Sequence, residues 1–170
     1  MPVKRPLLAA LAAALVLGAA FFPLRVLEVA REGGRPVFMA PLGEGDSFSL
    51  CFLHSVEGTP VCDHFRVDEK GGLVLYETTF SSLNTGMPTG VREGERVSLE
   101  GGVVRLTGRR IPVGEVVLAV TPSAANSLAV GGRTVDLPGL AGEGRLRLRI
   151  ARRGAAIYIL HVAGRVLRGF

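Results

Sequence analysis

The titratable side chains of this chain concentrate in residues 54–65, which read His-Ser-Val-Glu-Gly-Thr-Pro-Val-Cys-Asp-His-Phe. The segment contains His54 and His64, two of the three histidines, and the two cysteines, Cys51 and Cys62, lie just before it and within it. A turn requires only residues such as Gly, Pro, Asn or Ser, so this density of imidazole, hydroxyl and carboxylate groups exceeds what a turn needs. The segment is therefore either a catalytic or binding site, or a network of polar side chains that only stabilises the fold.

Three side chains of this segment, His54, Glu57 and Asp63, could together hold a metal ion. Carboxylates favour hard cations, and a histidine admits zinc or another transition metal. A site built from cysteine and histidine is less favoured, because the spacing matches no zinc pattern. Alternatively, Ser55, Glu57 and Thr59 satisfy the N–H groups of the turn in a purely structural network. Three interpretations stay open: a polar network, a bound metal ion, and recognition of a ligand or partner.

A hydrolase at the same place would need a nucleophile, and the serines available are Ser55 and Ser82. His54 would act as the base, with Glu57 or Asp63 orienting its imidazole. Adjacent residues of an extended strand point to opposite faces, so His54 and Ser55 could meet only in a tight turn. The chain also has no Gly-x-Ser-x-Gly elbow. Catalysis is therefore the alternative to a binding function, and we expect no catalytic residue here.

Alternating apolar runs on both sides of the segment predict a β-hairpin. If Cys51 pairs with Cys62 across the ladder, Leu50 faces Asp63 and residues 54–59 form the loop. Asp63 then lies on the core face, where a carboxylate must find hydrogen bonds or a cation. The apolar members of that face would be Phe48, Leu50, Phe52, Val61, Phe65 and Val67.

The N-terminus is typical of an export signal. Lys4 and Arg5 precede residues 7–22, which are continuously apolar. Small residues offer a cleavage point after Ala20, whereas an uncleaved signal anchor fits equally well because about 20 apolar residues span a bilayer. In both cases the positive charges stay inside and the rest of the chain lies outside the cytoplasm.

We therefore expect residues 1–27 to be a signal peptide or signal anchor and residues 28–170 to be an exported domain. The domain would stay attached to the cytoplasmic membrane or be released to the periplasm or cell exterior. Because such compartments are oxidising, Cys51 and Cys62 are expected to form a disulfide with each other, and free thiols or an intermolecular bond are the alternatives.

Length and composition favour one all-β domain. The chain has 170 residues, 23 of them Gly and 10 Pro, and its short apolar runs are separated by Gly-containing turns. This pattern predicts a single sandwich or partly closed barrel of antiparallel strands after an N-terminal hydrophobic helix. Residues 115–120 are expected to form a central strand. Residues 155–162, which contain His161, are expected to pair in a hairpin with residues 145–151.

The net charge of +5 comes almost entirely from arginine. The arginines are scattered or gathered near the C-terminus without interleaved aromatic residues, so the pattern argues against nucleic-acid binding. Those near the C-terminus are expected on a solvated sheet face, with an acidic partner or anionic lipid headgroups as the functional alternative.

The central motif resembles a bacterial family called domain of unknown function 1850. In that family a His-Ser-Val-Glu turn is followed by Thr-Pro-Val, an acidic residue and an aromatic, here residues 54–57, residues 59–61, Asp63 and Phe65. Weaker matches follow farther along the chain: Phe80, Ser82, residues 84–88, residues 116–122 and residues 126–128. The resemblance runs from about Val26 to the C-terminus.

Three positions depart from the family pattern. Asp63 stands where Glu is more usual, Asn84 where Gly is usual, and Asn126 where His is frequent. Asn tolerates a positive φ better than most residues, so the backbone of the turn at Asn84 can be kept. If the histidine replaced by Asn126 belongs to a metal or catalytic group in the family, this chain lacks it.

The resemblance implies a small exported protein, often encoded beside tripartite ATP-independent periplasmic transporters, which take up small organic acids. We therefore expect an accessory or binding module whose partners are transporter components or a small organic acid. The alternatives are a hydrolase-type enzyme at the same tip and a purely structural envelope protein. Its contact surface would combine residues 54–63 with the turn at residues 82–88. The side chains expected to take part are His54, Ser55, Glu57, Thr59, Asp63, Ser82, Asn84 and Thr85.

Overall fold

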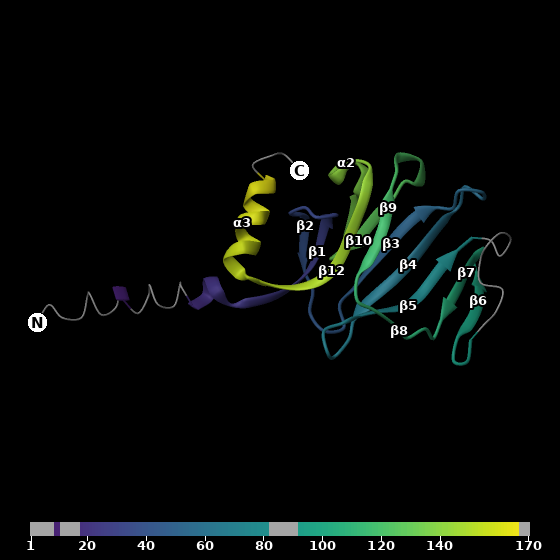
Figure 1. Ribbon diagram of the computed structural model, residues 1–170. Coiled ribbons are helices and arrows are strands. Elements are labelled where there is room, and N and C mark those ends of the chain that lie inside the picture. The colour runs from purple at the N-terminus through teal and green to yellow at the C-terminus, as the bar shows by residue number, and fades with distance from the viewer. Residues whose placement is uncertain (1–8, 11–17, 82–91, 167–170) are drawn as a thin grey trace, which may run out of the picture.

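The computed structural model describes residues 9–10, 18–81 and 92–166, which form two facing antiparallel sheets (Figure 1). The first sheet contains β1 (Pro23–Arg31), β2 (Pro36–Pro41), β9 (Val116–Val120) and β12 (Gly144–Gly154), in the order β2-β1-β12-β9. The second contains β3 (Ser47–Leu53), β4 (Pro60–Val67), β5 (Leu73–Phe80), β6 (Arg96–Glu100), β7 (Val103–Thr107), β10 (Ser127–Val130) and β11 (Arg133–Asp136). Its order is β11-β10-β3-β4-β5-β7-β6, and the short β8 (Ile111–Val113) pairs with β5.

The main hydrophobic core lies between the two sheets. The first sheet contributes Leu27 and Val29 from β1 together with Leu146 and Leu148 from β12, all almost fully buried. The second sheet contributes Phe48, Leu50, Phe65 and Val67, and the rings of Phe48 and Phe65 stack 5.1 Å apart. A smaller cluster lies farther along the second sheet and consists of Val61, Phe80, Val104 and Leu106, with Phe52 against it.

The expected all-β class is confirmed, since the described chain is mostly antiparallel sheet with few helices. Both sheets have free end strands within the described ranges, so they do not close into a barrel. The apolar stretch expected to form an N-terminal helix is described only at residues 9–10 and 18–22, and helix is present at 9–10 and 18–21. No helix in the described parts of the chain has both the length and the apolar character needed to cross a membrane.

The folded domain includes residues that the sequence assigned to the export segment. β1 begins at Pro23, and Val26 and Leu27 have no exposed surface. Residues 23–27 are therefore part of the sheet, and a fragment beginning at residue 28 would lack half of β1.

The prediction of a strand at residues 155–162 was wrong. β12 continues to Gly154, and the chain then forms the helix α3 (Ala155–Val166), which carries His161. β9 pairs only with Gly144–Leu148 of β12, so the rest of that edge is unpaired, yet the chain after Gly154 turns into a helix that contacts β12 and β2. The alternation of apolar residues in this run therefore does not reflect sheet pairing.

The expectation of a central strand at residues 115–120 was also wrong. β9 is the end strand of the first sheet, where it pairs with β12 alone. Val117 is accordingly exposed, whereas Val120 at the end of the strand is buried. A continuous apolar run predicts burial on both faces, but here one face of an edge strand stays in contact with solvent.

Two short helical turns lie where the chain passes from one sheet to the other. The 3-10 turn η1 (Pro122–Ala124) follows β9, and the Thr121 side chain caps it by accepting a hydrogen bond from the Ala124 N–H at 3.3 Å. The helix α2 (Leu137–Ala141) follows β11, and Asp136 caps it by accepting a hydrogen bond from the Gly139 N–H at 2.7 Å.

The outer side of the first sheet holds a buried ion pair. Glu28 on β1 is 2 % exposed and accepts hydrogen bonds from Arg149 at 3.0 Å and from Arg153 Nε at 2.9 Å. Arg149 lies directly opposite Glu28 in the ladder. Two of the arginines near the C-terminus therefore hold a carboxylate inside the fold, whereas Arg145 and Arg147 lie on the solvated face that the sequence predicts.

Candidate functional site

The disulfide and the hairpin register are confirmed. Cys51 and Cys62 are bonded, with their Cα atoms 4.1 Å apart, and they face each other across β3 and β4. In the same ladder Leu50 lies opposite Asp63. The cross-link therefore braces the neck of the hairpin whose loop, residues 54–59, is the tip of the candidate site. A disulfide of this kind is typical of oxidising compartments.

The loop at residues 54–59 is closed by hydrogen bonds to His54. The His54 N–H donates to the Thr59 carbonyl at 2.9 Å, and the Gly58 N–H donates to the His54 carbonyl at 2.8 Å. The imidazole contributes too, since Nδ1 accepts from the Glu57 N–H at 3.4 Å. Gly58 has φ +62°, a conformation that glycine adopts without strain. The histidine thus shapes the loop, and Ser55 beside it is exposed.

Asp63 finds the hydrogen bond that its place on the core face requires. Its Oδ1 accepts from the Thr78 hydroxyl at 2.7 Å, and Thr78 lies opposite it on β5 and is buried. The same hydroxyl accepts from Arg109 Nη1 at 2.9 Å, and Arg109 Nε donates to Glu95 Oε1 at 3.0 Å. These four side chains form a continuous polar chain, which we call the Asp63–Glu95 network.

The Asp63–Glu95 network ends in the turn before β6. The second oxygen of Glu95 accepts from the Arg92 N–H at 3.0 Å. This backbone hydrogen bond, followed by the hydrogen bond from Arg109, lowers the pKa of Glu95. The side chains of Arg109 and Glu95 are 13 % and 6 % exposed, so the ion pair is largely shielded from water. The network consequently ties the hairpin, β5 and the turn at residues 92–95 together.

His64 belongs to the opposite face of the second sheet. Its Nδ1 is 2.7 Å from the Ser49 hydroxyl and its Nε2 is 3.1 Å from the Thr79 hydroxyl, so strands on both sides hold the ring. Burial lowers the pKa of His64, against the opposing effect of the carboxylates of Glu77 and Asp63. The imidazole is therefore a neutral link between β3 and β5 at physiological pH.

The residues singled out by sequence are thus separated by the fold. Asp63 lies within β4 and accepts a hydrogen bond from the Thr78 hydroxyl, whereas His54 and Ser55 lie in the loop at residues 54–59. Within the described ranges no three His, Cys, Asp or Glu side chains gather as a metal site, so His54, Glu57 and Asp63 do not form one. Ser82, Asn84 and Thr85 lie outside the described residues, and the second half of the expected surface lies there with them.

The comparison with protein families agrees with the motif at the hairpin. The model of the family described as Domain of unknown function (DUF1850) matches residues 48–137. The chain belongs to this family. No curated protein matches the chain, and no solved structure matches it either.

The DUF1850 match covers the hairpin and both ends of the Asp63–Glu95 network. It begins at Phe48 in β3 and ends at Leu137, the first residue of α2. It thus spans the second sheet together with β9, while β1, β2 and β12 lie outside it. The part of the fold that the DUF1850 model describes is therefore the sheet that carries the tip.

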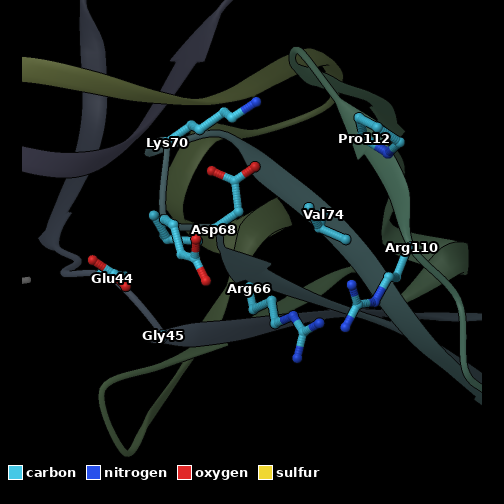
Figure 2. Close-up of a pocket in the computed structure, with 10 residues that line it drawn as sticks. Glu44, Gly45, Arg66, Asp68, Lys70, Val74, Arg110 and Pro112 are labelled. Carbon is cyan, nitrogen blue, oxygen red and sulfur yellow. The ribbon is translucent and has the colours of Figure 1, made fainter.

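A cleft of about 580 Å³ lies at the C-terminal end of β4, away from the hairpin loop at residues 54–59 (Figure 2). In Figure 2 Arg66 and Arg110 extend toward one end of the cleft and Lys70 lies toward the other. Three acidic residues, Glu44, Asp68 and Glu69, also line it, so its basic and acidic side chains balance. No motif in the sequence indicates this cleft, because its lining residues come from segments that are far apart in the chain, at residues 44–45, 66–74 and 110–112. Its balanced charge selects no class of ligand.

Proposed function

We propose that this chain is an extracytoplasmic accessory protein of a solute transport system, and that the tip of the β3–β4 hairpin is its contact surface. The observation that carries the proposal is the contrast between the tip and the groups beneath it. At the tip, Leu53 and Val56 are exposed above the disulfide, and Val56 is 72 % exposed. Beneath it, Asp63 and His64 are held by hydrogen bonds within the sheet.

A rigid exposed tip is suited to binding a protein. Because the disulfide and the His54 hydrogen bonds fix the loop before binding, little conformational entropy is lost when a partner contacts it. A catalytic centre would need a nucleophile and a base within hydrogen-bonding reach, but His54 Nδ1 accepts from the backbone N–H of Glu57. The described cleft lies at the opposite end of β4, so we assign a transporter component rather than a small acid to the tip.

Two parts of the proposal, export from the cytoplasm and association with a transport system, have different supporting observations. Export is supported by Lys4 and Arg5 before the apolar residues 7–22 and by the disulfide. The transport system is supported by the resemblance to a family often encoded beside tripartite ATP-independent periplasmic transporters.

The test is uptake of a small organic acid by cells that lack the chain and are complemented with variants of it. Val56→Asp places a charge at the tip, whereas Val117→Asp makes the same change on the exposed side of β9. Loss of an apolar anchor from an interface weakens binding by about tenfold or more, so we expect Val56→Asp to lower uptake and Val117→Asp to restore it. Equal uptake with both variants, or uptake without the chain, would overturn the proposal.

A further inference from the structure

The helix α3 exposes apolar side chains where a helix on the surface of a domain is normally polar. Ile157, Ile159, Leu160 and Val162 are all exposed, and Leu160 is 71 % exposed. Surface helices usually turn a polar face to water and an apolar face to the core. The twelve residues of α3 include no acidic side chain. This helix therefore has an outer surface that water solvates poorly.

A second exposed apolar pair adjoins the start of α3. Phe21 is 78 % exposed, and Phe22 beside it is exposed as well. The Ala155 N–H, at the first residue of α3, donates to the Phe22 carbonyl at 3.0 Å. The backbone of Gly154 also comes close to the same segment, because a Cβ there would lie 3.3 Å from the Ala20 carbonyl oxygen. The two aromatic residues and α3 thus form one apolar surface, which we call the α3 surface.

The α3 surface lies at one end of the molecule. Figure 1 shows α3 close to the described helical turn before β1, with β6 at the far side of the second sheet. α3 contacts β12 and β2, and Arg165 near its end stands over the ring of Phe38 at 5.0 Å. From Gly144 to Val166 the sequence contains six arginines and no carboxylate side chain. Glu28 pairs with Arg149 and Arg153, and Arg145 and Arg147 lie near Glu32 and Glu115 at the start of β12. The positive charge beside the α3 surface therefore comes mainly from Arg152, before the helix, and Arg165, in its last turn.

We propose that the α3 surface lies in the interface of a lipid bilayer. The apolar sequence of residues 7–22 ends at Phe22, so the α3 surface continues directly from a stretch with the composition of a membrane segment. An apolar helix flanked by arginines suits the boundary between acyl chains and anionic headgroups. With twelve residues α3 lies along the membrane and does not cross it. This inference does not depend on the proposed function.

The absence of tryptophan from the chain makes a clean test possible. Leu160→Trp places a single reporter on α3, and Leu99→Trp places a matched reporter on β6, since these leucines are 71 % and 70 % exposed. The full chain is reconstituted into phosphatidylcholine–phosphatidylglycerol vesicles, with and without brominated acyl chains. Because an interfacial helix sits about 5–10 Å into the boundary, we expect blue-shifted emission from the Leu160→Trp reporter and at least about twofold stronger quenching than for Leu99→Trp.

Two results would overturn the proposal. Equal, red-shifted and unquenched emission from both reporters would mean that α3 stays in water even when the chain is held at the membrane. Blue-shifted emission at Leu160→Trp without quenching would mean that protein covers the helix, either a second copy or another segment of this chain. Ile157→Trp repeats the measurement one turn earlier, so a folding defect of one variant does not remove the test.

Discussion

Removing the Thr78 hydroxyl should destabilise the fold far more than its burial alone suggests. Valine has nearly the shape of threonine, so Thr78→Val leaves no cavity, but it removes two hydrogen bonds, one to Asp63 at 2.7 Å and one from Arg109 at 2.9 Å. Hydrogen bonds to charged groups contribute about 1.5–3 kcal/mol each. Because Asp63 is only half-buried and water can replace part of the loss, we expect the lower end of the summed range, about 3 kcal/mol.

The neighbouring threonine provides the matched control. Thr79→Val changes the same atoms one residue later, on the other face of β5, where the hydroxyl meets His64 at 3.1 Å. That bond joins two neutral groups and should contribute about 1 kcal/mol. Urea unfolding of the full chain in mild detergent, with the disulfide intact, gives the free energy of unfolding of both variants. If the two values agree within about 0.5 kcal/mol, the charged character of the Asp63–Glu95 network has no energetic role.

Three further outcomes are expected. Burial lowers the pKa of His64 below its ordinary 6.5, so the unfolded chain takes up a proton first; stability should fall as pH drops below about 6.5, and His64→Gln should flatten that fall. The Arg92 N–H and then Arg109 lower the pKa of Glu95 below 4.5, so its contribution is complete above about pH 4.5 and lost at lower pH, a loss that Glu95→Gln should reduce. Reducing the disulfide, whose cysteines are 11 residues apart in sequence, should lower the free energy of unfolding by roughly 2–3 kcal/mol, measured by urea unfolding with and without reductant.

Local pattern was sufficient to predict the hairpin. Alternating side chains fix which residues share a face, and the two cysteines fix the register, so the pairing of Leu50 with Asp63 followed from sequence. The remainder of the network did not, because Arg109 and Glu95 reach Asp63 only through the pairing of β5 with β4 and through a turn distant in sequence. Nothing in the spacing of these residues indicates that contact.

The error at α3 has a different physical origin. A run of alternating apolar residues becomes a strand only if it pairs with a sheet edge, and residues 155–166 do not pair with the part of the β12 edge that β9 leaves open beyond Leu148. The run also contains residues that a helix accepts, such as Ala156 and Leu160. Apolar residues that face outward on a helix violate the usual amphipathic pattern, so sequence alone favoured the strand.

The pairing of β1 with β12 means that the domain completes its fold only when both ends of the described domain have reached the same compartment. β1 is made first and β12 last among the strands, yet they pair over the whole of β1, from Pro23 opposite Gly154 to Arg31 opposite Leu146. Until β12 is made, β1 has only β2 beside it, and an isolated two-stranded hairpin is marginally stable. β9 likewise waits for β12. A product truncated before Gly144 lacks β12, so the first sheet cannot assemble over the core face of the second sheet.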